Sequence, residues 1–202
     1  MTNVYTVFVK SDVYTSEWVY RMKRSIEKNT TVPFRFFCLT NENLPGIETI
    51  PLVNPNGWWA KMELCRPDIK GRVHYLDLDT IITGNIDFFL NETESLLYED
   101  WLYDDQKESA VFVLNEEERK TVWDFWSKDP RFHMFNFFGD GRVYNFTIGK
   151  SLGTIQGKHP GKLFTWKKTD KKSLQPGCKI LSFSGKPKPN DFSDDHWIKK
   201  YW

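Results

Sequence analysis

The stretch that most constrains this chain covers residues 72–87 and reads RVHYLDLDTIITGNID. Its β-prone run, residues 73–76, predicts a buried strand. The run leads directly into Asp77 and Asp79, with Leu78 between them. Two neighbouring carboxylates at a strand end repel each other and lose solvation. The simplest compensation is a divalent cation, Mn²⁺ or Mg²⁺, which takes carboxylate and phosphate oxygens together.

The position of this D-x-D pattern favours a ligand site. In open α/β sheets, ligands bind outside the carboxyl ends of the strands. The apolar pair Ile81 and Ile82 follows the acids, which indicates a sheet edge and not a loose loop. We therefore predict that residues 77–79 hold a metal and a diphosphate. The alternative is a strand that ends in an acidic turn with Gly84 and Asn85, because so short a motif has low specificity.

The rest of the chain predicts an α/β domain with a central, mostly parallel sheet flanked by helices, as in Rossmann-like folds. Apolar spacing predicts helices over residues 15–28 and 116–126 and a short helix over 56–64. Further strands are expected at residues 4–9, 34–39, 47–52, 109–114, 163–166 and 178–183, and residues 137–141 read as a turn.

Composition limits the function classes. A length of 202 residues suits one domain, residues 1–202. The net charge of +1 gives no sign of a nucleic-acid partner. No apolar run approaches ~20 residues, so no transmembrane segment is expected. The three scattered cysteines fit reduced, buried thiols, and the N-terminus lacks a signal-peptide pattern. These features predict a soluble, cytoplasmic protein.

Several polar residues are candidate contacts for a bound nucleotide. Lys10, Ser11 and Thr40 follow the first two predicted strands, although ordinary strand-end polar residues would look the same. Lys61 lies upstream of the D-x-D strand and is a plausible phosphate contact, or a solvated lysine. Near the C-terminus, residues 184–188 read SGKPK and suit an anion-binding loop. A basic surface tail is the alternative there.

Five segments together resemble a known family. They are WWxKxELxRP from Trp58, GRVxYLDLDT from Gly71, SAVFVL from Ser109, GDG from Gly139 and CKILSFSGKPKP from Cys178. Their order and spacing are similar to those of nucleotide-sugar glycosyltransferases with the GT-A fold. The resemblance is to the glycogenin-like and galactinol-synthase-like group and its bacterial and viral relatives. If the chain is viral, the expected location is the host cytoplasm.

The resemblance implies roles for individual residues. Asp77 and Asp79 would hold Mn²⁺ on the donor diphosphate, and Lys61 would contact phosphate. Asp140 would lie near the transferred sugar. A nucleotide-binding half would span about residues 1–90, and an acceptor-side half residues 91–202.

The C-terminal loop departs from the family pattern, because Ser184 stands where the family has a metal-binding histidine. The third protein ligand could then be Ser184, the later His196, or water. Gly185, Lys186 and Lys188 keep the pattern and would bind the diphosphate, with Lys186 as the main contact.

The function that follows is metal-dependent transfer of a hexose from a UDP-sugar to a hydroxyl of a glycan or glycoprotein. An inverting reaction needs a carboxylate base, for which Asp100, Asp104, Asp105 and Asp140 are available. A retaining reaction needs none. Two alternatives remain open: a nucleotidyltransferase, although the chain lacks a G-x-G-x-R loop after the first strand, and a non-catalytic carbohydrate-binding protein that uses the nine tryptophans.

Overall fold

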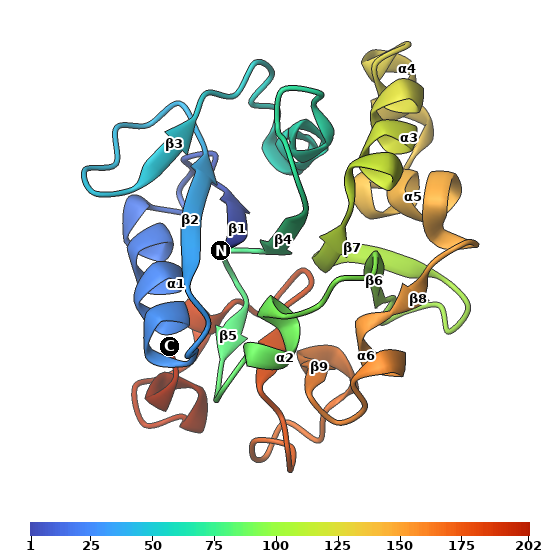
Figure 1. Ribbon diagram of the computed structural model, residues 1–202. Helices are drawn as coiled ribbons and strands as arrows, with labels where there is room; N and C mark the ends of the chain where they lie inside the picture. Colours follow the sequence, from blue (N-terminus) through green and yellow to red (C-terminus); the bar gives the residue numbers. More distant parts are fainter.

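The structure is a computed structural model that describes residues 1–202, and it is built around a seven-stranded sheet (Figure 1). The strand order is β3-β2-β1-β4-β7-β6-β8. β1 pairs in parallel with β2 and β4, and β2 with β3, whereas β7 is antiparallel to β4 and β6. The predicted α/β class with a mostly parallel sheet is confirmed. The strands are β1 Thr2–Val7, β2 Phe34–Leu39, β3 Glu48–Ile50, β4 Val73–Leu76, β6 Leu96–Glu99, β7 Lys107–Leu114 and β8 Gly153–Thr154.

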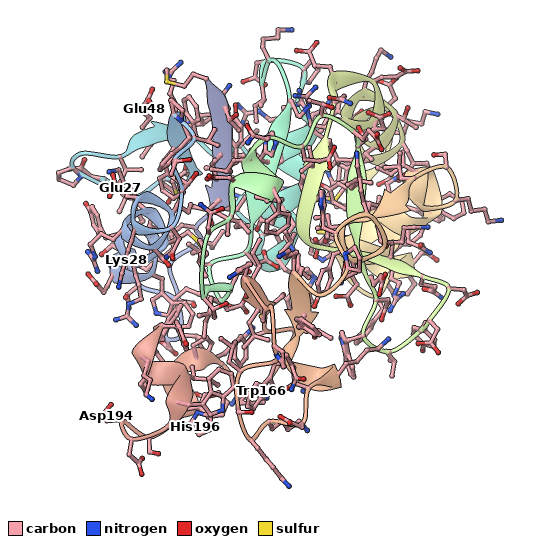
Figure 2. The ribbon with its side chains drawn as sticks, turned by 60° about the horizontal axis from the view of Figure 1, so that its bottom comes forward. Glu27, Lys28, Glu48, Trp166, Asp194 and His196 are labelled. Carbon is pink, nitrogen blue, oxygen red and sulfur yellow. The ribbon has the colours of Figure 1, made fainter.

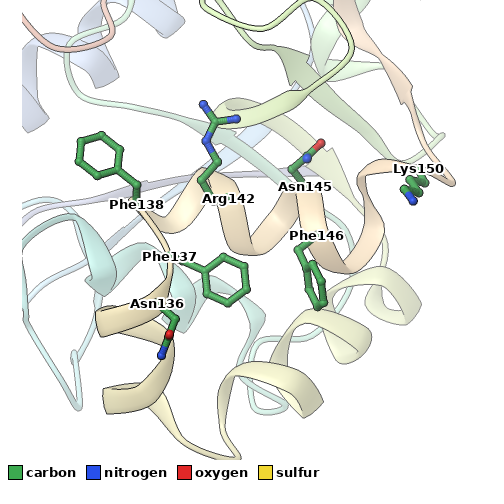
Figure 3. Close-up of a pocket in the computed structure, with 7 residues that line it drawn as sticks. All are labelled: Asn136, Phe137, Phe138, Arg142, Asn145, Phe146 and Lys150. Carbon is green, nitrogen blue, oxygen red and sulfur yellow. The ribbon is translucent and has the colours of Figure 1, made fainter.

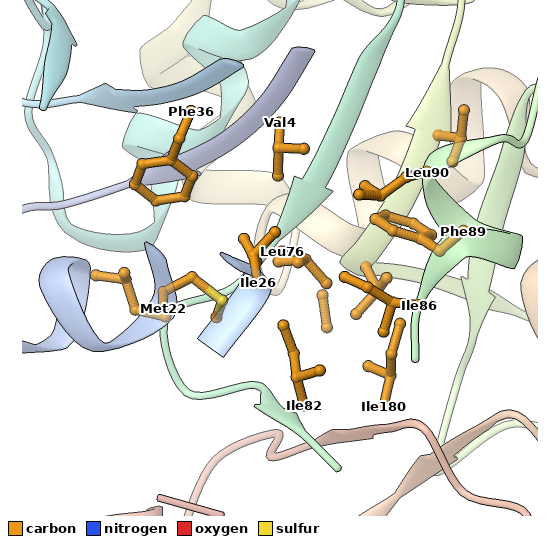
Figure 4. Close-up of a cluster of buried hydrophobic side chains, with 14 of the residues drawn as sticks. Val4, Met22, Ile26, Phe36, Leu76, Ile82, Ile86, Phe89, Leu90 and Ile180 are labelled. Atoms are coloured by element: carbon orange, nitrogen blue, oxygen red, sulfur yellow. The ribbon is translucent and has the colours of Figure 1, made fainter. Parts of the chain in front are cut away.

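One face of the sheet is covered by α1, Ser16–Lys28, which lies beside β2 in Figure 1. The helix buries Trp18, Val19, Met22 and Ile26, the apolar positions whose spacing predicted it. They pack into a core of 23 buried residues, part of which Figure 4 shows. This core also receives residues from the short α2, Asp87–Leu90, so it fixes the chain on both sides of the D-x-D motif.

The opposite face carries a second core of 19 buried residues beneath η1, Gly57–Cys65, and α3, Glu116–Trp126. Trp59 of η1 stacks on Trp126 of α3 with 5.3 Å between ring centroids. This contact fixes η1, and therefore Lys61, against the sheet. The remaining helices are α4 Pro130–Asn136, α5 Asp140–Tyr144, a π-helical turn Asn145–Gly149 and α6 Ile155–Lys158.

A second, three-stranded sheet has the order β5-β10-β9 and was not predicted as a separate sheet. Its strands are β5 Ile81–Ile82, β9 Leu163–Thr165 and β10 Ile180–Ser182. β10 pairs antiparallel with β5, which follows the D-x-D acids directly. The chain that leaves β10 therefore starts beside those acids, although it is about a hundred residues away in the sequence.

The predicted elements agree with the structure in most places and differ at their ends. The strands over residues 34–39 and 73–76 and the helix over 116–126 are confirmed with these bounds. β7 begins at Lys107, two residues before the predicted start at Ser109, and the predicted turn at residues 137–141 is partly α5. The three cysteines are free and buried, as predicted. No helix has the length and apolar character needed to cross a membrane.

Candidate active site

A cleft of about 890 Å³ opens at the carboxyl ends of β1 and β4. Seven segments line it: the end of β1 with the following loop, η1, the end of β4 with the D-x-D acids, the loop of residues 101–103, the first half of β7, the start of α5, and the loop after β10. The sequence predicted site residues in five of them, and none in the loop of residues 101–103 or in β7. The cleft lies at the edge of the sheet where α/β folds bind ligands.

Lys61 is the centre of a buried ionic cluster on the cleft floor. Its Nζ lies 3.1 Å from the carboxylate of Asp77 and 3.0 Å from Oδ2 of Asp140. The hydroxyl of Ser109 donates to the same Asp140 oxygen at 2.5 Å, and the hydroxyl of Tyr75 donates to Asp77. Lys61 thus positions two carboxylates, and its ammonium is paired with both; a contact with phosphate stays a prediction.

The cluster changes the pKa values of its members. Burial alone would lower the pKa of Lys61, but the carboxylates of Asp140 and Asp77 together raise it, so the ammonium form is stabilised. Burial raises the pKa of Asp77 to about 6, with Asp79 and Asp140 acting in the same direction, against the opposing charge of Lys61. Asp77 therefore depends on a nearby positive charge to stay ionised.

Asp79 has a lysine partner of its own, which comes from the other end of the chain. The ammonium of Lys188 and the hydroxyl of Tyr14 both donate to Oδ2 of Asp79, the latter at 3.0 Å. No hydrogen bond is made to Oδ1. Lys188 also lies over the Tyr14 ring. One oxygen of the second D-x-D acid is therefore free toward the cleft.

The charges and ligands of this arrangement decide whether it can hold a divalent cation. Three carboxylates, of Asp77, Asp79 and Asp140, face the two ammonium groups of Lys61 and Lys188, so the cluster has a formal charge of −1. No group of three or more His, Cys, Asp or Glu side chains is arranged to hold a metal ion. The site therefore fits a cation that takes two carboxylates from the protein and its other ligands from phosphate and water, as Mg²⁺ often does.

The loop after β10 closes one side of the cleft. Ser184 donates to Oε2 of Glu108 at 3.3 Å, and Gly185 has a φ of +69°, which favours glycine. Lys186 lines the cleft and makes no ion pair, while its carbonyl accepts a hydrogen bond from Lys167. Loop residues 184–188 thus face the D-x-D acids, but Lys188 and not Lys186 touches them.

Two predicted nucleotide contacts lie outside the cleft. Lys10 is exposed, with its Nζ 4.0 Å from Glu42. Thr40 is buried, and its backbone N–H donates to the carbonyl of Ile50. Of the three strand-end residues, only Ser11 lines the cleft, and its hydroxyl accepts the backbone N–H of Tyr14 at 3.1 Å. Leu78 also lines the cleft, between the two acids.

Of the four acids predicted as candidate bases, one lines the cleft and the others lie outside it. Asp140 lines the cleft, whereas Asp100 is buried behind it, 2.6 Å from Arg142. Asp100 also accepts the N–H of Leu102, so it holds a loop in place. Asp104 and Asp105 are exposed outside the cleft, and Asp104 pairs with Lys168. Among the four acids, the structure brings only Asp140 into the site.

His196 does not lie near the D-x-D acids. Its ring packs 4.5 Å from that of Phe192 and 6.1 Å from that of Trp166, and its Nδ1 accepts the N–H of Ile198. Figure 2 shows it beside Trp166 at the outer edge of the C-terminal segment. It does not line the cleft. His196 therefore caps a 3₁₀ turn and packs in an aromatic cluster outside the cleft that holds the D-x-D acids.

The cleft residues that sequence reasoning missed include Glu108, Tyr14 and Arg142. Burial, and then the charge of Asp100, raises the pKa of Glu108 to about 7. Glu108 was missed because the predicted strand started one residue after it. The available signal was an acid directly before the apolar run SAVFVL, whereas Asp77 directly follows an apolar run.

Among known proteins, this chain matches solved structures but no family model and no curated sequence. Apo GlyE of Streptococcus pneumoniae TIGR4, a glycosyltransferase, superposes with a TM-score of 0.71 at 16% identity, over 100% of this chain and 59% of that chain. The galactosyltransferase LgtC, in complex with donor and acceptor sugar analogues, gives 0.62 at 14% identity, over 98% of this chain and 93% of that chain.

The bifunctional glycosyltransferase WbbM gives a TM-score of 0.67 at 10% identity, over 93% of this chain and 46% of that chain. The present chain thus spans only about 59% of the length of GlyE but most of LgtC. Likeness at such identities concerns the backbone. The chain has the GT-A fold of these glycosyltransferases.

Proposed function

We propose that the protein is a metal-dependent glycosyltransferase that moves a hexose from a UDP-sugar to a hydroxyl of a glycan or glycoprotein acceptor. The observation that carries this proposal is the cluster of Asp77, Asp79 and two lysines on the floor of a cleft, within a glycosyltransferase fold. The cleft volume of about 890 Å³ is in the usual range for small-molecule ligands.

In this proposal the two D-x-D carboxylates hold Mn²⁺ or Mg²⁺. When bound, the cation supplies positive charge opposite the departing diphosphate. The formal charge of −1 on the cluster favours a cation, and the free Oδ1 of Asp79 offers it an oxygen. Lys61 keeps Asp77 ionised and in place, because burial alone would favour its protonated form.

The lysines of the loop after β10 bind the donor diphosphate. Lys186 lines the cleft without an ion pair, so its ammonium is available for a phosphate oxygen. Lys188 is held by Asp79 without ligand and lies within reach of whatever that carboxylate binds. Both charges would stabilise the negative charge that develops on the leaving group.

Two carboxyl groups, Asp140 and Glu108, line the cleft away from the D-x-D pair. Asp140 shares Oδ2 with Lys61 and Ser109, which holds the other carboxylate oxygen in a fixed direction. An inverting reaction would take its base from these two. A retaining reaction would use them only to orient substrate.

The test is calorimetry with a panel of nucleotide-sugars, with and without MnCl₂, followed by an assay for released UDP. We expect one UDP-sugar to bind in the presence of Mn²⁺ and to be hydrolysed slowly without acceptor. Release of pyrophosphate from UTP and a sugar 1-phosphate would indicate a nucleotidyltransferase instead. Glycan binding without any nucleotide-sugar binding would indicate a carbohydrate-binding protein. Asp105→Asn, an exposed acid outside the cleft, is the matched control for variants of the cluster.

A further inference from the structure

A second hollow of about 430 Å³ lies beside the cleft, over α5 and the π-helical turn; we call it the α5 groove (Figure 3). No part of the proposed donor site uses it. Its lining residues include Asn136, Phe138, Arg142, Asn145, Phe146 and Lys150.

The α5 groove is continuous with the cleft, because Phe138 and Arg142 line both. Arg142 is fixed by Asp100 at 2.6 Å, so the boundary between the two hollows is held in place. Figure 3 shows the ring of Phe138 and the guanidinium of Arg142 on the same side of α5. A chain-like ligand that leaves the cleft at this boundary would enter the groove directly.

The groove presents aromatic rings to solvent. Phe138 is 97% exposed and Phe146 is 65% exposed. Phe146 is nevertheless held in position, with its ring centroid 5.2 Å from that of Phe125 and 5.5 Å from that of Phe137. Five of the eleven exposed large apolar side chains line the cleft or this groove, and such a concentration marks a binding surface.

Polar groups also line the groove. The amide nitrogen of Asn136 donates to the carbonyl of Phe132, while its oxygen has no partner. Lys150 is exposed and makes no ion pair or side-chain hydrogen bond. Exposed rings in one groove with a free amide oxygen and a free ammonium group match a sugar chain, which presents C–H faces and hydroxyls, better than a hydrocarbon surface.

We propose that the acceptor is an oligosaccharide whose reacting end lies in the cleft and whose distal sugars lie in the α5 groove against Phe146. This inference rests on the proposed glycosyltransferase function and adds the size of its acceptor. It assigns Phe146, Asn136 and Lys150 to acceptor binding and none of them to the chemical step.

The experiment compares the full chain with Phe146→Ala and Lys150→Ala on an array of immobilised glycans one to six sugars long. Phe135→Ala is the matched control, because this ring is 90% exposed but does not line the groove. We expect the wild type and Phe135→Ala to bind oligosaccharides more tightly than single sugars. Phe146→Ala should bind the oligosaccharides about tenfold more weakly, as expected for loss of one aromatic contact. Melting temperatures of all variants check that the fold is retained, and Lys150→Ala tests the groove without altering the aromatic cluster.

Three results would overturn the inference: binding of single sugars only, equal glycan binding by all four proteins, or no glycan binding at all. Co-sedimentation with phosphatidylglycerol vesicles that is lost in Phe135→Ala and Phe146→Ala alike would show a membrane surface instead, and would also overturn it. UDP-sugar binding by calorimetry is measured in parallel. Its absence would reject the proposed function separately, while unchanged donor affinity in Phe146→Ala would place the defect in the acceptor groove.

Discussion

Lys188 donates to Asp79 across 109 residues of sequence, and this pair closes the C-terminal loop onto the D-x-D motif. The side chain of Asp79 is only 6% exposed, so its carboxylate depends on the ammonium for compensation. The second sheet makes the contact possible, because β10 pairs with β5 directly after the acids. The pair thus connects the two segments that the proposed donor site requires.

Removing this lysine should destabilise the unliganded protein. Lys188→Ala leaves Asp79 without a counter-charge, so we expect the free energy of unfolding in urea to fall by about 1–3 kcal/mol. Lys186→Ala, whose ammonium has no partner, should change it by less than ~0.5 kcal/mol. MnCl₂ should recover more stability in Lys188→Ala than in the wild type. Equal stability of the two variants would argue against the role of the pair.

Lys186→Ala should act on donor binding. Because charge-assisted contacts to phosphate are worth roughly 1.5–3 kcal/mol, the affinity for the UDP-sugar should fall about tenfold to a hundredfold. Calorimetry at constant MnCl₂ measures this, with Lys128→Ala, an exposed lysine outside the cleft, as the control. If Lys186→Ala binds the donor as the wild type does, the loop lysine is a solvated surface residue.

Among these variants, Lys61→Met should lower the free energy of unfolding most. The substitution keeps the length of the side chain but leaves Asp77 and Asp140 without their shared partner in a buried site. Breaking a buried ion pair from one side typically costs about 3–5 kcal/mol. Lys120→Met, in an exposed pair with Asp124, should cost less than ~0.5 kcal/mol. Urea unfolding of both variants gives the comparison, and similar losses would contradict a central role for Lys61.

The parts that could be predicted from sequence are local. The apolar run before Asp77 and the helical spacing of Trp18, Val19, Met22 and Ile26 are each encoded within a few residues, and the structure has both elements. The sequence predicted most of the segments that form the cleft, since five of its seven lining segments contain residues named in advance as site candidates.

What could not be predicted depends on contacts across the chain. The strands β9 and β10 were predicted, but the pairing of β10 with β5 and β9 into a separate sheet and the Lys188–Asp79 pair join distant segments and have no local signature. Thr40 ends a strand, as Ser11 follows one, yet its backbone is paired with Ile50 and its side chain is buried. A residue that follows a strand in the sequence can be placed at the edge of the sheet. The sequence does not tell whether its side chain points into the cleft or into the core.

A pH dependence of stability should come from His74. Burial lowers the pKa of this histidine from 6.5 to about 4. Because the unfolded chain then binds the proton more tightly, stability is full above pH 6.5 and falls as the pH drops toward 4. The loss is on the order of 3 kcal/mol at most. Urea unfolding between pH 4 and 8 should show this slope in the wild type and a smaller one in His74→Gln. Identical slopes would assign the acid sensitivity to other groups.

The last prediction concerns the cation. Asp79→Asn removes the charge of one proposed ligand but keeps the shape of the side chain, so the dependence of UDP binding on Mn²⁺ should disappear. His196→Ala should leave that dependence unchanged, because its ring packs against Phe192 and lies outside the cleft.

Ser184→His tests whether the loop after β10 can supply a third protein ligand for the cation. The Ser184 side chain lines the cleft beside the D-x-D acids, so a histidine there adds a nitrogen ligand that Mn²⁺ can accept. Calorimetric titration of MnCl₂ in the presence of UDP should give tighter binding for this variant than for the wild type. If His196→Ala loses Mn²⁺ binding while Asp79→Asn keeps it, the cation lies in the C-terminal segment. That result would reject the D-x-D assignment.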